Sequence, residues 1–326
     1  MYQDTWFYSR KTHIFSTGGR TLFTCFRLFF SCASVLGLLS CIHVREAVYL
    51  DIYQGEPIPF EEMIASLTKA RVVYVGEVHT IKRHHRFQLR VIRALDEEKI
   101  SLAVGMEMLP FSTQEYLDRW IEGDLGEKEF LKLVDWETNW SIDFGLYKPI
   151  FEYAREKKIR LLALNAPRAL VKTVARKGLS GLTDEEKGML PPVTPSTEEH
   201  RRYLALSLKQ HKTLRGDMAR SAYEAQDVWD STMAYYVVEY LQSGEGKDKT
   251  VVILAGSGHM VYGYGIPERV ARAADLPHRI ILPTGSGDVE FQKEWEKFIE
   301  PTTLTHEDFN FIQRPIADFM FLVPLR

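Results

Sequence analysis

Two apolar segments of this chain end in the same short motif, a glycine followed three residues later by a histidine. The run 71–75 (RVVYV) leads into Gly76-Glu77-Val78-His79, and the run 251–255 (VVILA) leads into Gly256-Ser257-Gly258-His259. Short apolar runs of this kind are typical of buried strands in a parallel sheet. Ligands of open α/β sheets bind outside the carboxyl ends of the strands. We therefore expect both histidines to face one site.

Two further apolar runs are expected to bring polar side chains to the same edge of the sheet. Residues 101–105 (SLAVG) precede Glu107, and residues 159–164 (IRLLAL) precede Asn165 and Arg168. Strand-like runs alternate with helical periods along the chain. The sequence therefore predicts an α/β fold, with a parallel-sheet core and helices on both faces.

At these residues the chain resembles the ChaN-like haem-binding uptake lipoproteins of bacteria, a family that shares a superfamily with the Tiki-type metalloproteases. Six motifs occur in the order that the family shows: Gly76-Glu77-x-His79, His84-His85-x-x-Gln88, Glu107, Asn165-Ala-Pro-Arg168, Gln226-Asp-x-Trp229-Asp230 and Gly256-x-Gly258-His259-x-x-Tyr262. They extend over roughly residues 74–266. Each motif alone is a weak signal, whereas six in order make a strong one.

The resemblance implies haem as the ligand, with its iron held by a tyrosine and cofacial haems in a homodimer as one arrangement. The ligating tyrosine stays open among Tyr235, Tyr236, Tyr262 and Tyr264. His84 and Gln88 are one helical turn apart, so we expect this pair to line the pocket while His85 faces elsewhere. The complete set expected to bind haem is His79, His84, His85, Gln88, Asn165, Arg168, His259 and the four tyrosines.

A metal site is the alternative interpretation of the same motifs. Glu77, His79, Glu107 and His259 form a mixed nitrogen and oxygen donor set that suits zinc or another divalent ion. Glu107 could instead activate a metal-bound water. The chain would then be an exported metal-dependent hydrolase or peptidase, with these four residues as its catalytic groups, rather than a binding protein. The full-length resemblance favours haem binding.

The amino-terminal 40 residues have the pattern of a secretory signal. Arg10, Lys11, Arg20 and Arg27 precede an apolar stretch, 28–39, that is too short to span a bilayer. The stretch ends Leu38-Leu39-Ser40-Cys41, which resembles a bacterial lipobox. We expect cleavage before Cys41, lipidation of that cysteine, and an exported lipoprotein attached to a membrane and facing the periplasm or the cell surface. An uncleaved anchor helix or a simple secretory signal are the alternatives.

Composition excludes several other kinds of chemistry. The three cysteines are Cys25, Cys32 and Cys41, so the mature chain would hold no disulfide and no thiolate site. Subtracting the four basic residues and the one acidic residue of the signal leaves a net charge of about −6. Nothing in this balance indicates binding to nucleic acid.

The long connection between the strands 159–164 and 251–255 is expected to be helical. It contains helical periods at 168–176, 198–210 and 220–242 and no strand-like run. A structureless loop of this length is improbable inside a domain. We therefore predict a helical insertion, residues 167–246, that covers the strand ends, within an α/β core domain formed by residues 42–166 and 247–326.

Overall fold

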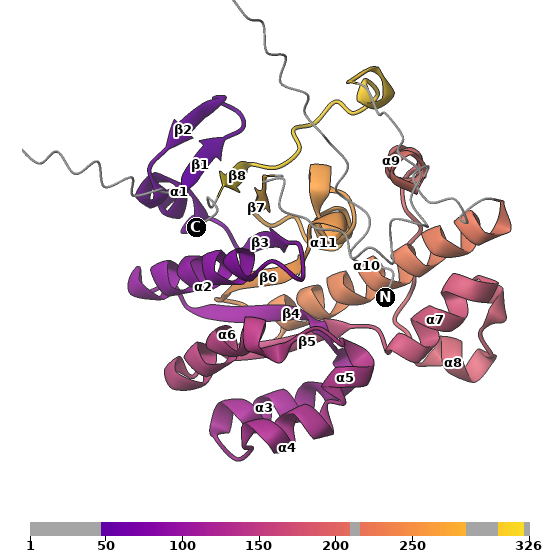
Figure 1. Cartoon of the computed structure of the whole chain (residues 1–326), viewed down its shortest axis with the longest axis horizontal. Helices are drawn as coiled ribbons and strands as arrows, with labels where there is room; N and C mark the ends of the chain where they lie inside the picture. The colour runs from indigo at the N-terminus through magenta and orange to yellow at the C-terminus, as the bar shows by residue number, and fades with distance from the viewer. Residues whose placement is uncertain (1–46, 209–215, 285–305, 323–326) are drawn as a thin grey trace, which may run out of the picture.

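The computed structural model describes residues 47–208, 216–284 and 306–322, and within them the chain forms one eight-stranded sheet (Figure 1). The strand order is β2-β1-β8-β7-β3-β6-β4-β5. The strands are β1 (Val48–Asp51), β2 (Glu56–Ile58), β3 (Val72–Glu77), β4 (Leu102–Pro110), β5 (Arg160–Asn165), β6 (Thr250–Gly256), β7 (His278–Pro283) and β8 (Phe319–Leu322).

The six strands from β8 to β5 run parallel, which confirms the predicted α/β fold. The antiparallel edge formed by β1 and β2 was not predicted. A tight turn makes this hairpin: the Asp51 carboxylate accepts hydrogen bonds from the backbone N–H groups of Tyr53 and Gln54, both at 2.9 Å, and Gly55 takes a positive φ of 73°.

Alternate residues of each central strand enter different cores, as the two-residue period of a strand requires. Val73 and Val75 of β3 belong to one core, and Val72 and Tyr74 to the other. The first core is covered by α1 (Phe60–Leu67), α2 (Lys82–Glu97), α3 (Gln114–Glu122), α4 (Glu127–Leu133), α5 (Trp136–Asn139) and α6 (Phe144–Lys157). The second is covered by α9 (Glu198–Leu208), α10 (Asp217–Gln242) and α11 (Ile266–Ala273).

The connection between β5 and β6 is helical in its described residues, which lack only 209–215. It holds α7 (Arg168–Lys177), α8 (Asp184–Gly188), α9 and α10. The carboxyl-terminal half of α10 packs on the sheet through Met233 and Val237. Its amino-terminal half instead shares a small separate core with α7, so the two helices lie side by side (Figure 1).

The predicted signal segment and Cys41 lie outside the described residues. Within the part of the chain that the structure describes, no helix has both the length and the apolar character needed to cross a membrane.

Candidate functional site

The strand order brings four polar strand ends next to one another. β6 lies between β3 and β4, so Gly256 stands between Glu77 and Glu107 at the carboxyl edge of the sheet. The Gly256 backbone N–H donates to the Glu107 carboxylate at 2.6 Å. A Cβ atom on Gly256 would stand 2.9 Å from the His79 ring. The two G-x-x-H turns therefore meet, as the sequence predicts.

Glu77 is the centre of the first half of this site. Its buried carboxylate accepts hydrogen bonds from His79 Nδ1, the Tyr147 hydroxyl and Gln88 Nε2, each at 2.7 Å, and it pairs with His85 Nδ1 at 3.3 Å. Burial alone would raise the pKa of Glu77, but the His85 and His79 rings hold it well below its usual range. Glu77 is therefore a carboxylate saturated by donors from α2, from α6 and from the turn that follows its own strand.

The predicted roles of the adjacent histidines are wrong in one respect. His85, not His84, joins Gln88 at the Glu77 carboxylate, and its Nε2 donates to the His79 carbonyl at 2.9 Å. His84 accepts the backbone N–H of Val78 at 3.0 Å through Nδ1. Burial lowers the pKa of His84 to about 3 and keeps the ring neutral. His84 thus holds the turn after β3.

The second half of the site is built on His259. Its Nε2 lies 3.2 Å from Glu107 and its Nδ1 lies 2.6 Å from Asp230 on α10. Burial would lower the pKa of His259, but these two carboxylates outweigh it and raise the pKa to about 10. The ring is therefore an imidazolium that donates a hydrogen bond to each carboxylate.

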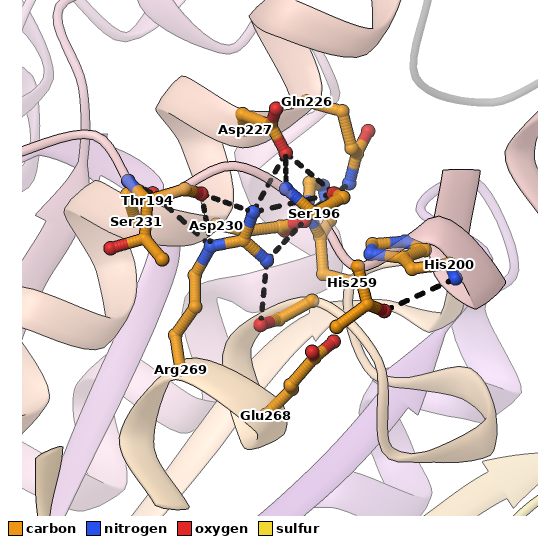
Figure 2. A network of polar contacts seen from close by, with 12 residues as sticks. Thr194, Ser196, His200, Gln226, Asp227, Asp230, Ser231, His259, Glu268 and Arg269 are labelled. Carbon is orange, nitrogen blue, oxygen red and sulfur yellow. Dashed lines mark hydrogen bonds and ion pairs between the residues drawn. The ribbon is translucent and has the colours of Figure 1, made fainter. Parts of the chain in front are cut away.

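A buried arginine extends this network to α11 (Figure 2). Arg269 pairs with Asp227 at 2.7 Å and lies 3.6 Å from Asp230, and it donates to the Thr194 carbonyl at 2.8 Å. The Gln226 amide also donates to Asp230, at 3.2 Å. These contacts tie the loop before α9 and the middle of α10 to the His259 turn.

The donor geometry does not support the predicted metal site. The described residues contain no group of three or more His, Cys, Asp or Glu side chains arranged to hold a metal ion. A metal ligand must present a free nitrogen lone pair, whereas both ring nitrogens of His259 face carboxylates. Zinc and the metal-dependent hydrolase therefore lack support from Glu77, His79, Glu107 and His259.

Asn165 and Arg168 support the rim rather than pointing at its centre. The Asn165 amide donates to the Glu107 carbonyl at 2.8 Å, where β4 shifts its register against β5. This bond fixes the backbone that carries the Glu107 side chain. Arg168 Nη1 donates to the Thr138 carbonyl at 2.7 Å and so joins α7 to α5.

The four candidate tyrosines separate into two pairs. Tyr235 and Tyr236 lie on α10 with their rings 5.3 Å apart, and Tyr236 stacks on Phe111 at 4.8 Å. Burial and Glu239 raise the pKa of Tyr236 to about 12. Tyr235 and Tyr236 follow Asp230 by five and six residues. Because an α-helix has 3.6 residues per turn, both side chains point away from the face of α10 that carries Asp230.

Tyr262 and Tyr264 lie just beyond His259, beside α9. Tyr264 is fully buried, donates to Glu199 at 2.6 Å and stacks on His200 at 4.9 Å. Tyr262 is only partly buried, has a left-handed φ of 57°, and contacts the Tyr203 ring at 5.5 Å. The Tyr262 backbone is held by the Ile316 carbonyl at 2.8 Å and by Arg314 at 3.4 Å.

Several residues of this site are absent from the set expected from the sequence. Asp230 and Gln226 belong to a motif that the sequence contains, and the acidic residues 227 and 230 interrupt an otherwise apolar helix period, which is a usable signal. Tyr147 is not among the expected site residues, yet its hydroxyl reaches Glu77. Nothing in the sequence marks His200, whose ring nitrogens have no hydrogen-bond partner in the described residues.

Gly256 offers a test of this packing. We expect Gly256→Ala to lower the free energy of unfolding by roughly 1–3 kcal/mol, because the new methyl group would press on the His79 ring, which packs against Trp140 at 4.7 Å. Urea denaturation monitored by circular dichroism measures this change. Gly244→Ala is the control, since nothing lies within 4 Å of its added Cβ. Equal stability of the two variants would contradict the described contact.

The imidazolium state of His259 predicts a loss of stability at alkaline pH. Its pKa is about 10 in the folded chain against an ordinary value of 6.5, so its stabilisation is complete below pH 6.5 and is lost as the pH rises toward 10. We expect the melting temperature of the protein to fall over this interval. His259→Gln should melt lower at pH 6.5 and show a flatter dependence on pH. Parallel pH profiles for the two proteins would contradict this assignment.

Comparison with known proteins assigns the chain to a family. The model of the family described as "Haem-binding uptake, Tiki superfamily, ChaN" matches residues 63–270, which include every strand-end residue of the site. The chain belongs to this family. A solved structure of ChaN from Campylobacter jejuni with cofacially bound haem is 20% identical, with a TM-score of 0.62, and the match covers 84% of this chain and 96% of that one. The fold is therefore that of ChaN.

A curated plant protein is also similar in sequence. Protein RETICULATA-RELATED 5, chloroplastic, from Arabidopsis thaliana is 25% identical over 305 residues, which are 86% of this chain. The match covers 39% of the plant protein, so the chain spans less than half the length of this relative.

Proposed function

We propose that this chain binds haem on a surface beside α9, with Tyr262 as the ligand of the iron. A haem site needs an axial donor, an apolar surface for the ring and cations for the propionates. Membership of a haem-binding uptake family supports the ligand class. The observation that carries the position is the partly exposed aromatic cluster around Tyr262.

The apolar side of the proposed site consists of residues that are neither fully buried nor fully exposed. We call it the Tyr262 surface; its members are Tyr262, Phe309, Phe311, Ile312 and Ile316. All five pack on the second core, and the buried Tyr203 ring of α9 lies 6.4 Å from Phe309. A planar apolar ligand would cover side chains that the fold leaves half uncovered.

Two arginines stand at this surface. The Arg202 guanidinium lies 4.0 Å from the centre of the Phe311 ring, and both Arg202 and Arg314 are exposed. Arg314 reaches the Tyr262 carbonyl and pairs with Glu199 at 3.4 Å. Guanidinium groups suit carboxylates such as propionates. The residues present therefore fit the chemistry of haem, whose iron accepts a tyrosinate oxygen when it is bound.

The other three tyrosines fit this role less well. Tyr264 is enclosed, and burial together with its bond to Glu199 raises its pKa, which opposes the tyrosinate form. Tyr236 is covered by Phe111. Tyr235 is 43% exposed, but its described ring contact is with Tyr236 on α10. Tyr262 is also the only one of the four with a left-handed backbone, a conformation that structures tolerate most often at functional positions.

A haemin titration of the full-length protein, followed through the Soret band, tests this function. We expect a saturable red shift of the band at stoichiometric haemin, and no such shift with bovine gamma globulin as a protein control. Absence of saturation would contradict haem binding by this chain.

We further propose export and attachment to a membrane through lipid on Cys41, in line with the apolar stretch and the lipobox-like sequence. Mass spectrometry of the membrane fraction should find a lipid on Cys41 that is lost in Cys41→Ser. The name of the plant relative gives that protein a chloroplast location. Import of this chain into such an organelle, with Cys41 unmodified, would contradict the lipid anchor.

We propose finally that residues 167–246 act as a cover for the strand ends and that two chains pair when haem is bound. The cofacial haem binding of the Campylobacter jejuni protein supports the second idea. Sedimentation velocity with and without haemin should show a doubling of mass only with haemin. An unchanged monomer at saturating haemin would contradict pairing.

A further inference from the structure

Helix α2 carries a row of basic residues on its solvent side. Lys82, Arg86, Arg90 and Arg93 are exposed, and they recur every three or four residues, so they share one face of the helix. We call this row the α2 basic face. The opposite side of α2 is buried and includes Phe87, Val91 and Leu95.

Ion pairs within the fold do not explain this row. In the described part of the chain, no carboxylate lies within ion-pair distance of any of its four members. The first turn of α2 holds no acidic residue, although the positive end of the helix dipole favours acidic side chains there. Lys82 therefore lies where a cation slightly destabilises the helix, in a mature chain whose expected net charge is about −6.

Two of the cations are held in fixed positions. The Arg90 guanidinium lies 3.7 Å from the centre of the Phe60 ring and donates to the Tyr49 hydroxyl at 2.5 Å. The Arg93 guanidinium lies 5.0 Å from the centre of the Tyr153 ring. Stacking of this kind fixes the side chain before a partner arrives, which lowers the entropy cost of binding.

The α2 basic face lies next to the point where the described chain begins. Tyr49, in the first strand, contacts Phe87 of α2 at 5.9 Å as well as Arg90. Cys41 precedes Ala47 by six residues, which span at most about 22 Å when fully extended. This step rests on the proposed attachment at Cys41, which would hold α2 near the lipid headgroups.

We infer that the α2 basic face docks on an anionic lipid surface. The headgroup phosphates and carboxylates of such a surface complement four unpaired cations in one row. Each Lys or Arg near an anionic membrane contributes about 1 kcal/mol, or roughly fivefold in partitioning. The contact would give the domain one orientation on the membrane.

Flotation of the full-length protein with vesicles tests this inference. Partitioning onto vesicles of phosphatidylcholine alone measures the contribution of the lipid anchor. Partitioning onto vesicles with 30% phosphatidylglycerol measures the added effect of negative charge. We expect the partition coefficient to rise with phosphatidylglycerol and to fall at high salt. In the double variant Lys82→Gln/Arg86→Gln, the increase in partition coefficient caused by phosphatidylglycerol should be roughly twentyfold smaller, because each cation contributes about fivefold.

The matched control is Lys172→Gln/Arg176→Gln on α7, a lysine and an arginine that are also four residues apart and exposed. This control variant should keep the full increase in partition coefficient with phosphatidylglycerol. The inference would be overturned by equal losses in the two double variants or by a wild type that does not respond to phosphatidylglycerol. It would also be overturned if the Lys82→Gln/Arg86→Gln variant lost binding only to a DNA column. Failure to bind neutral vesicles would instead count against the anchor, while a surviving response to phosphatidylglycerol would still support the basic face.

Discussion

Replacing Glu77 with alanine is expected to lower the free energy of unfolding by about 3–5 kcal/mol. Four donors converge on this buried carboxylate, from His79, His85, Gln88 and Tyr147. The variant would leave these donors buried without an acceptor, and Glu77 no longer sustains the raised pKa of the His85 ring. Guanidinium denaturation followed by tryptophan fluorescence measures the change.

The control for this variant is Glu62→Ala. Glu62 is exposed in the first turn of α1 and should cost less than about 1 kcal/mol, the usual range of a helix-end charge. A loss below 1 kcal/mol for Glu77→Ala would mean that the four donors find other partners. The contacts at the centre of the site would then not be those described here.

Tyr262→Phe is expected to weaken haemin binding at least 100-fold, which corresponds to about 2.7 kcal/mol. The change removes only the phenol oxygen and keeps the ring that packs against Tyr203 and Tyr264. The ring packing should therefore keep the variant folded, and the loss should appear in the Soret titration.

Tyr264→Phe gives the opposite pattern and serves as the matched control. It removes the hydrogen bond to Glu199, so we expect a loss of stability of about 1–2 kcal/mol with the Soret titration unchanged. Tyr235→Phe should change neither property. Loss of haemin binding in Tyr235→Phe, with binding retained in Tyr262→Phe, would move the site to the exposed face of α10.

Much of the fold could be predicted because the short apolar runs, and the glycines that follow them, determine the local backbone structure. The parallel strands β3, β4, β5 and β6 follow from four such runs, and the meeting of the two G-x-x-H turns follows from the rule for strand ends. The edge hairpin formed by β1 and β2 could not be predicted in this way, because strands of three or four residues show no clear alternation of apolar and polar side chains.

Side-chain partners were harder to predict than strand positions. Periodicity gives the spacing of His84, His85 and Gln88 on α2, but the preceding turn sets how the helix is rotated against Glu77. Residue types alone also favoured a metal site, because carboxylates and imidazoles that pair with one another have the same sequence pattern as those that bind a metal. The pairing of both His259 ring nitrogens with carboxylates, one of them Asp230 on a helix more than 100 residues beyond Glu107, is visible only in the fold.

The most direct test of haem binding through Tyr262 is a resonance Raman spectrum of the full-length protein with ferric haem bound. Iron–tyrosinate vibrations should be present in the wild type and in Tyr264→Phe, and absent from Tyr262→Phe at saturating haemin. A wild-type spectrum without tyrosinate modes, or modes that persist in Tyr262→Phe, would contradict the proposed ligand.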